Sequence, residues 1–380
     1  MFKVKPILFA ILGIALVMGA CKKEVEKKTE TPLTIASTYD TSNYQSNITE
    51  IVPKTQAFDE LIKELKKGRV NGTKLEYDKL IPFLTSYNNT YIWTDMIPYN
   101  VSLIMGNNTG WLERAVKASG STFHPDSSNN GMGGTFGGYL FTELGFEPEQ
   151  MIEKDMFGSY FSKMAIQLLV IDEPTLKSVD QALYFIGLTP QFKNSGDSKH
   201  GIYADRYLAN YIARRDKNDG NGYYSQIKFN FLKLQSAIKA GPQYNKERDE
   251  ARFAIRSILE KATYATVINY VQSSISNMSQ TEMTDAQKAA TLHALAESAG
   301  FSTGWARMAR KKMSDETNQD ILYLLQAYPS IFGNPKFFLN DRINQVQFLT
   351  QLIQILKTEL QFSDADINDF KQNWVAVQNR

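Results

Sequence analysis

Apolar residues recur at intervals of three and four along most of this chain, which is the spacing of one face of an α-helix. Phe58, Leu61, Ile62 and Leu65 follow this spacing, and Gly68 stands where such a helix would end. The other helices predicted in this way cover residues 75–84, 147–170, 253–275, 284–312, 345–360 and 363–377. Long alternating strand patterns are missing from the sequence. The pattern therefore predicts an all-α protein built from long helices packed as bundles.

Capping signals mark the start of three of these helices. Thr284 followed by Gln287 has the pattern of a capping box, and Ser363 followed by Asp366 has the pattern of an N-cap. Pro148 suits the first turn of the long helix that follows it.

The connections between helices divide the chain. Glycine is concentrated in residues 131–138, and we expect this stretch and residues 121–130 to form one long, mobile loop. A Gly-Pro pair just before Asn245 suggests a boundary there. We therefore predict two adjoining helical bundles, residues 48–244 and 245–380.

The first residues have the layout of a secretory signal. Lys3 and Lys5 precede an apolar stretch that ends at Ala20, directly before Cys21. This stretch is shorter than the roughly 20 residues that a helix needs to span a bilayer. We therefore predict a signal peptide over residues 1–20.

Cys21 makes this segment resemble a bacterial lipoprotein signal with its lipobox, although Met18 stands where leucine is usual. The resemblance implies removal of the signal and attachment of lipid to Cys21. An uncleaved anchor, or an ordinary signal with an incidental cysteine, is the alternative. The lipoprotein reading predicts a protein held to a membrane of the bacterial cell envelope, and no Asp follows Cys21 to suggest retention at the inner membrane.

Residues 21–47 are predicted to be a flexible tether, because their first part is highly charged and almost free of large apolar groups. Loss of the signal lowers the Lys and Arg count from 42 to 40, which equals the Asp and Glu count of 40. A neutral protein has no general attraction for nucleic acid, so we expect no nucleic-acid partner. Cys21 is the only cysteine, so the fold must rely on packing without disulfides.

Four segments together resemble imelysin-like proteins, which are exported helical proteins and often lipoproteins. They are residues 144–154, 179–187, 265–270 and 293–301. The order and spacing of these segments resemble an uncharacterised, domain-of-unknown-function branch of that family. The resemblance implies an all-α, imelysin-like fold, attachment to the outer membrane and a role linked to iron acquisition.

The better-known imelysins carry a Gly-x-His-x-x-Glu motif, associated with a proposed metal or metallopeptidase site. None of His124, His200 and His293 fits that motif. The branch usually has an Asp-Glu pair where this chain has Asp180 and Gln181. The missing carboxylate weakens any inherited metal site.

His293 and Glu297 are four residues apart and therefore share one face of a helix. Zinc peptidases also use this spacing, but they need two histidines with a glutamate between them. The pair either forms a hydrogen bond on or between helices, or belongs to a polar site between the bundles that ligates a metal with Asp180. The family resemblance adds Gln150 and Lys154 as candidate binding residues.

Three other carboxylates, Glu147, Glu149 and Glu153, share a predicted helix with Lys154. We expect most of these charges on a solvated face, because the repeated Glu-x-x-His signature of di-iron bundles is absent. The phosphate-loop ending and the Gly-x-Ser-x-Gly elbow are also absent. We therefore expect a non-enzymatic binding lipoprotein for iron, another metal or another nutrient, with a divalent metal as the candidate cofactor. A metal-dependent, peptidase-like hydrolase is the alternative.

Overall fold

The computed structural model describes residues 31–85, 92–106, 109–196, 204–327 and 333–380. The predicted signal peptide and Cys21 lie outside the described residues. Within them the chain is all-α, as predicted, with one short β-hairpin. No helix in the described part is long and apolar enough to cross a membrane.

The first half of the chain contains α1 (Tyr44–Ile48), α2 (Val52–Lys66), η1 (Lys67–Arg69), α3 (Tyr77–Leu80), η2 (Ile81–Phe83), α4 (Pro98–Met105), α5 (Trp111–Ala118), β1 (Gly133–Phe136), β2 (Tyr139–Thr142), α6 (Pro148–Met156), η3 (Phe157–Ser162), α7 (Lys163–Ile166), η4 (Gln167–Ile171) and α8 (Leu176–Ile186). The second half contains α9 (Tyr207–Arg214), α10 (Tyr223–Ala240), η6 (Pro242–Tyr244), α11 (Asn245–Met278), α12 (Asp285–Ala306), α13 (Asp315–Leu324), α14 (Phe337–Asn340), α15 (Arg342–Leu360), α16 (Asp364–Asp369) and α17 (Trp374–Val377).

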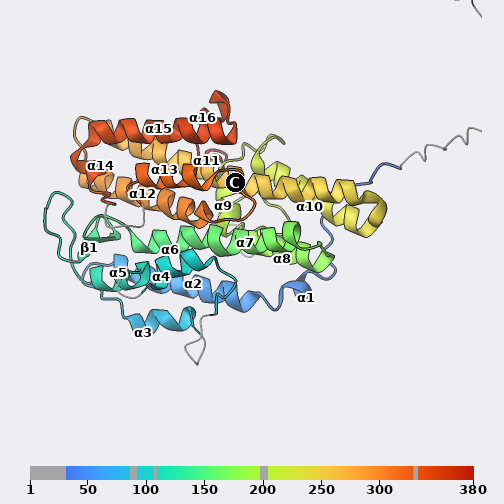
Figure 1. Cartoon of the computed structure of the whole chain (residues 1–380), viewed down its shortest axis with the longest axis horizontal. Helices are drawn as coiled ribbons and strands as arrows, with labels where there is room; N and C mark the ends of the chain where they lie inside the picture. Colours follow the sequence, from blue (N-terminus) through green and yellow to red (C-terminus); the bar gives the residue numbers. More distant parts are fainter. Residues whose placement is uncertain (1–30, 86–91, 107–108, 197–203, 328–332) are drawn as a thin grey trace, which may run out of the picture. The chain divides into compact units, whose positions relative to one another are not determined.

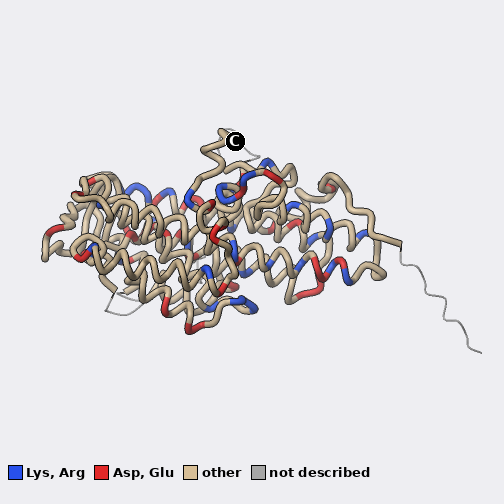
Figure 2. The backbone as a smooth tube through the Cα atoms, turned by 90° about the horizontal axis from the view of Figure 1, so that it is seen from above, with Lys and Arg blue, Asp and Glu red and all other residues tan. Residues whose placement is uncertain are grey.

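The helices lie in layers (Figure 1). The run from α6 to α8 forms the middle layer, with α2 and α5 packed on one side and α12 on the other. Next to α12 lies α11, which also packs against α10 and α15. Acidic and basic residues are interspersed along these helices (Figure 2).

The helix predicted over residues 147–170 is present, but it is not α-helical throughout. It runs from α6 through η3, α7 and η4, and η3 and η4 are π-helical. Such segments widen a helix by one residue and occur often at functional sites. In this chain η3 begins with Phe157, whose ring lines a pocket described below.

Both predicted caps are present. Thr284 and Gln287 form the capping box of α12, and Ser363 and Asp366 form that of α16. The helix predicted to reach Lys312 ends at Ala306 instead. Beyond it, the buried Glu260 carboxylate accepts hydrogen bonds from the backbone N–H groups of Lys312 and Met313, which stabilise a non-helical connection.

The glycine cluster was predicted to be part of a long, mobile loop, and this prediction is wrong at its end. Strands β1 and β2 pair antiparallel, with Phe136 opposite Tyr139. Between them Gly137 and Gly138 have φ of 57° and 84°. Two positive φ values in a two-residue connection are what a tight hairpin turn needs, and glycine reaches them without strain.

The predicted division into two adjoining bundles at Asn245 stays a prediction. Leu33–Arg380 forms one compact unit. Asn245 is the first residue of α11, which packs against α10 before it and α12 after it, so the expected boundary lies within this unit. The end of the expected tether is folded as well, because Tyr39 and Tyr44 are buried against the helices.

Candidate functional site

Helices α6 and α12 approach each other closely because glycines lie at their crossing. A Cβ on Gly304 would lie 2.4 Å from the Asp155 carbonyl oxygen, and a Cβ on Gly300 would lie 2.6 Å from that of Gln150. On the facing helix, a Cβ on Gly158 would lie 2.5 Å from the backbone of Gly304. This close approach brings the charged side chains of α6 within reach of those of α12.

Eight side chains at this crossing form a closed circle in which acidic and basic groups alternate. In order they are Lys66, Glu153, Lys154, Glu297, His293, Glu147, Arg69 and Glu149. We call this set the charge ring.

The contacts between α6 and α12 form one half of the charge ring. His293 lies with Nδ1 2.5 Å from Oε2 of Glu147 and with Nε2 3.4 Å from Oε2 of Glu297. Lys154 Nζ lies 3.4 Å from Oε1 of Glu297 and also contacts Glu153. The His293–Glu297 spacing therefore places both residues against α6.

The end of α2 and the turn η1 supply the other half. Arg69 lies 2.8 Å from Oε1 of Glu147 and also contacts Glu149. Lys66 Nζ lies 3.8 Å from Glu149 and 3.7 Å from Glu153. Each of the four carboxylates therefore has two basic neighbours.

The prediction that these charges lie on a solvated face is wrong for the carboxylates of α6. Glu147 and Glu149 are 0% and 2% exposed. Buried charges are stable only when they are paired, and the charge ring provides this pairing. The sequence of α6 alone cannot show it, because Lys66, Arg69 and His293 come from elsewhere in the chain.

Burial and pairing shift several pKa values in the charge ring. Burial, together with the charges of Glu153 and Glu147, raises the pKa of Glu149 to about 7. Burial alone would lower the pKa of His293, but the charge and hydrogen bond of Glu147 outweigh it and the pKa is raised. Burial would raise the pKa of Glu153, but Lys154 and Lys66 outweigh it and the pKa is lowered. Glu153 therefore stays ionised at neutral pH.

A cavity of about 370 Å³, which we call the first pocket, lies between α2, η3 and α9. Its lining consists of Phe58, Asp59, Ile62, Lys63, Lys66, Glu153, Phe157, Arg206, Tyr207, Asn210 and Tyr211. Lys66 and Glu153 belong to both the charge ring and this lining, so the two features are continuous.

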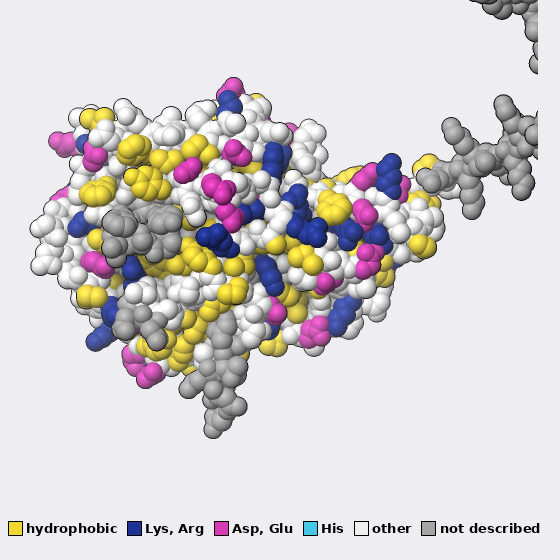
Figure 3. All heavy atoms as spheres, in the orientation of Figure 1, with side chains coloured by type: hydrophobic (Ala, Val, Ile, Leu, Met, Phe, Trp, Pro, Cys, Tyr) yellow, Lys and Arg dark blue, Asp and Glu magenta, His cyan; other side chains and the backbone are white. Residues whose placement is uncertain are grey.

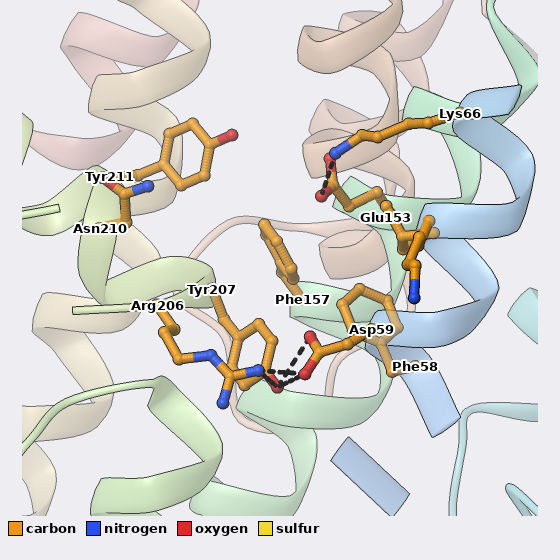
Figure 4. Close-up of a pocket in the computed structure, with 11 residues that line it drawn as sticks. Phe58, Asp59, Lys66, Glu153, Phe157, Arg206, Tyr207, Asn210 and Tyr211 are labelled. Atoms are coloured by element: carbon orange, nitrogen blue, oxygen red, sulfur yellow. Dashed lines mark hydrogen bonds and ion pairs between the residues drawn. The ribbon is translucent and has the colours of Figure 1, made fainter. Parts of the chain in front are cut away.

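The close-up in Figure 4 shows how the first pocket is built. Lys66 and Glu153 face each other at one end, and Arg206 pairs with Asp59 at the other. The Phe157 ring lies between these two ends, and Tyr211 projects from α9 on the opposite side. The pocket thus offers fixed positive and negative charges together with aromatic faces.

The structure brings most of the predicted site residues together. Lys154, His293 and Glu297 belong to the charge ring, and the buried Gln150 donates a hydrogen bond to Glu149. Asp180 has other partners, since it accepts hydrogen bonds from the Tyr39 hydroxyl at 2.6 Å and from the side-chain amide of Asn47 at 2.7 Å. His200, considered for the imelysin motif, lies outside the described residues.

Sequence reasoning missed the contribution of α2. Asp59, Lys63 and Lys66 are spaced by four and three residues, so they share one face of α2 and all line the first pocket. That charged stripe was a usable signal. The residues from the start of α9, Arg206 and Tyr207, follow no spacing that points to α2.

The donor chemistry of the charge ring does not fit the divalent metal considered above. Glu147 and Glu297 are the carboxylates nearest His293, and each also contacts a permanent cation, Arg69 or Lys154. A metal ion bound there would be repelled by both cations. In the described ranges there is also no group of three or more His, Cys, Asp and Glu residues placed to hold a metal ion.

Comparisons with known proteins give no relative for this chain: no family model matches it, and neither a curated protein nor a solved structure does. The imelysin-like resemblance therefore stays a prediction. Of its four segments, residues 144–154 and 293–301 lie largely on α6 and α12, which pack against each other.

Proposed function

We propose that this protein is a non-enzymatic binding lipoprotein of the bacterial cell envelope. We propose further that its first pocket binds a small nutrient with charges of both signs, such as an amino acid or a short peptide. The observation that carries the proposal is the lining of the first pocket, where three basic and two acidic side chains meet aromatic rings.

The volume of the first pocket suits a small organic molecule, because ligand pockets start at about 300 Å³. Lys66 and Lys63 provide positive charges for a carboxylate, while Glu153 provides a negative charge for an ammonium group. The lowered pKa of Glu153 keeps this charge in place at neutral pH. Phe157 and Tyr211 add aromatic faces, which attract cations and apolar groups alike.

The imelysin-like resemblance implies iron or another metal as the cargo. The pairing of the carboxylates with Arg69 and Lys154 argues for an organic ligand instead. A peptidase would need a complete metal-ligand set and a general base beside an open metal position. Cleavage of a bound peptide would therefore contradict the proposed non-enzymatic role.

The proposed location rests on Cys21 and the apolar segment before it. We propose that lipid on Cys21 anchors the protein to the outer membrane, with the compact unit Leu33–Arg380 carrying the binding site. Cell fractionation of Cys21→Ala tests this, with Lys22→Ala as the control. The variant should leave the membrane fraction while the control stays, and equal attachment of both would refute the anchor.

The binding proposal is tested by calorimetric titration of residues 22–380, which contain the whole compact unit, with amino acids and with dipeptides and tripeptides. Lys66→Gln and Lys63→Gln each remove one of the positive charges proposed to bind the ligand carboxylate. Loss of a hydrogen bond to a charged group costs about 1.5–3 kcal/mol, so each variant should bind at least about tenfold more weakly.

Lys79→Gln is the matched control. Lys79 forms an exposed ion pair with Glu76 and does not line the first pocket, so its replacement should leave the affinity unchanged. Failure of the parent to bind any member of the panel, or equal affinity of the parent and both pocket variants, would contradict the proposal. Tight binding of iron or zinc by the parent, or release of cleaved peptide, would contradict it as well.

A further inference from the structure

A second cavity lies next to the first pocket, on the other side of Arg206 and Tyr207. It encloses about 460 Å³ between α1, the start of α2, the end of α8 and the residues that follow α8. We call it the second pocket. Its apolar walls are Tyr44, Ile48, Val52, Tyr184, Leu188 and Pro190.

The second pocket differs from the first in its charge. Arg206 is the only charged residue among the described residues that line it, and the other polar lining groups are neutral hydroxyls and amides. A zwitterion would find no carboxylate here for its ammonium group. An anion with an apolar body would find both a guanidinium and apolar walls.

The backbone holds Arg206 firmly at this position. Gly187 ends α8 with φ of 90°, and its carbonyl oxygen accepts a hydrogen bond of 2.9 Å from the Arg206 N–H. A Cβ on Gly187 would lie 2.1 Å from the Arg206 carbonyl oxygen, so only glycine allows this contact. The end of α8 thus fixes where the guanidinium can reach.

The side chain of Arg206 is held between the two pockets. Its guanidinium carbon lies 4.6 Å from the centre of the Tyr207 ring. Its Nη2 contacts Asp59 and donates a hydrogen bond of 2.6 Å to the Tyr207 hydroxyl. A guanidinium has five N–H donors in a planar fork, and its hydrogen bonds to the described side chains Asp59 and Tyr207 use only Nη2. The side chain is 44% exposed, so an incoming ligand can reach it.

We propose that the second pocket is a separate binding site for a small organic carboxylate with an aliphatic or aromatic body. The carboxylate pairs with the Arg206 guanidinium, which matches its geometry with two parallel hydrogen bonds. The apolar body packs against the walls from α1, α2 and α8. A ligand site of this kind, mostly apolar with one placed polar group, is the common form of small-molecule pockets.

The test is calorimetric titration of residues 22–380 with benzoate and octanoate, and with benzamide and octanamide as uncharged counterparts of similar shape. The carboxylates should bind at least about tenfold more tightly than the amides, which lack the charge that Arg206 recognises. Equal affinity for carboxylates and amides, or no binding of the carboxylates at millimolar concentration, would overturn the proposal.

Two variants locate the site. Arg206→Gln should weaken carboxylate binding at least tenfold. Arg214→Gln is its matched control, because Arg214 lies 4.8 Å from the Tyr211 ring in the same way but does not line the second pocket. Val52→Trp should fill the cavity and abolish carboxylate binding. Because Arg206 also lines the first pocket, carboxylate affinity that is unchanged in either Arg206→Gln or Val52→Trp would overturn the proposal.

The two proposals fail separately. Val52 does not line the first pocket, so Val52→Trp should still bind amino acids or peptides like the parent. That result also shows that the variant is folded. If the parent binds carboxylates but no zwitterion, only the proposed function is wrong. If the parent binds zwitterions but no carboxylate, only the proposal for the second pocket is wrong.

Discussion

Replacing Gly304 by alanine tests whether the close crossing of α6 and α12 supports the candidate site. The new Cβ would lie 2.4 Å from the Asp155 carbonyl oxygen and 3.1 Å from the Gly158 Cα. Both neighbours are backbone atoms, so the helices must separate to admit it. Overpacking of this kind costs about 1–3 kcal/mol. Alanine recovers about 1 kcal/mol over glycine inside a helix.

Because the clash is with backbone, we place its cost at the upper end of that range. We therefore expect Gly304→Ala to lower the free energy of unfolding by about 1–2 kcal/mol. Urea unfolding of residues 22–380, followed by circular dichroism, measures this change. Ser273→Ala, an exposed position on α11, is the control and should change stability by less than about 0.5 kcal/mol. A Gly304→Ala variant as stable as the parent would refute the reasoning, because helix propensity would then outweigh a contact that we take to be tight.

Two further predictions concern the buried charges. The free energy of unfolding should fall as the pH rises from about 5 to 8. Burial raises the pKa of Glu149 to about 7 and that of Asp155 to about 6. The folded state therefore binds more protons than the unfolded state in this range. The raised pKa of His293 acts in the same direction. Glu149→Gln should flatten the pH dependence of urea unfolding. A steeper dependence in this variant would contradict the raised pKa of Glu149. Glu147→Gln should destabilise the protein towards the ~3–5 kcal/mol that breaking a buried ion pair costs, because Arg69 loses a buried partner. Glu76→Gln, which breaks an exposed pair, should cost less than about 1 kcal/mol in the same assay, and similar costs for the two variants would contradict the charge ring.

Local sequence signals predicted much of the fold. The apolar spacing identified α2, α11, α12 and α15. In α2 and α15 the spacing reflects one face buried against the core, whereas α12 is buried on all sides over residues 294–306. The capping box at Thr284 gave the start of α12 correctly. The end of α12 was missed because it depends on Glu260, which lies on another helix and binds the backbone of Lys312.

The site was predicted only in part, for a similar reason. The spacing of His293 and Glu297 correctly placed both on one helix face. The sequence predicted that the carboxylates of α6 lie on the surface, because it shows their charge but not their partners. Those partners, Lys66 and Arg69, are about 80 residues away. Burial of a charge depends on such long-range pairs, and a single helix pattern does not contain them.

The pockets depend even more on long-range contacts. Asp59 and Arg206 meet at one end of the first pocket although they are 147 positions apart in the sequence. Gly187 and Gly304 allow two close backbone approaches. No pattern in the sequence marks these two glycines as sites of such contact. Only the folded chain shows that a side chain at these positions would collide with backbone.

The most direct test of the central claim is to compare one ligand with its charge-blocked forms. The tightest-binding amino acid or dipeptide of the panel is titrated into residues 22–380 alongside its N-acetylated form and its carboxamide. If the first pocket recognises charges of both signs, each blocked form should bind at least about tenfold more weakly, because each loses a charged contact. Equal affinity for the free and the blocked forms would contradict the account.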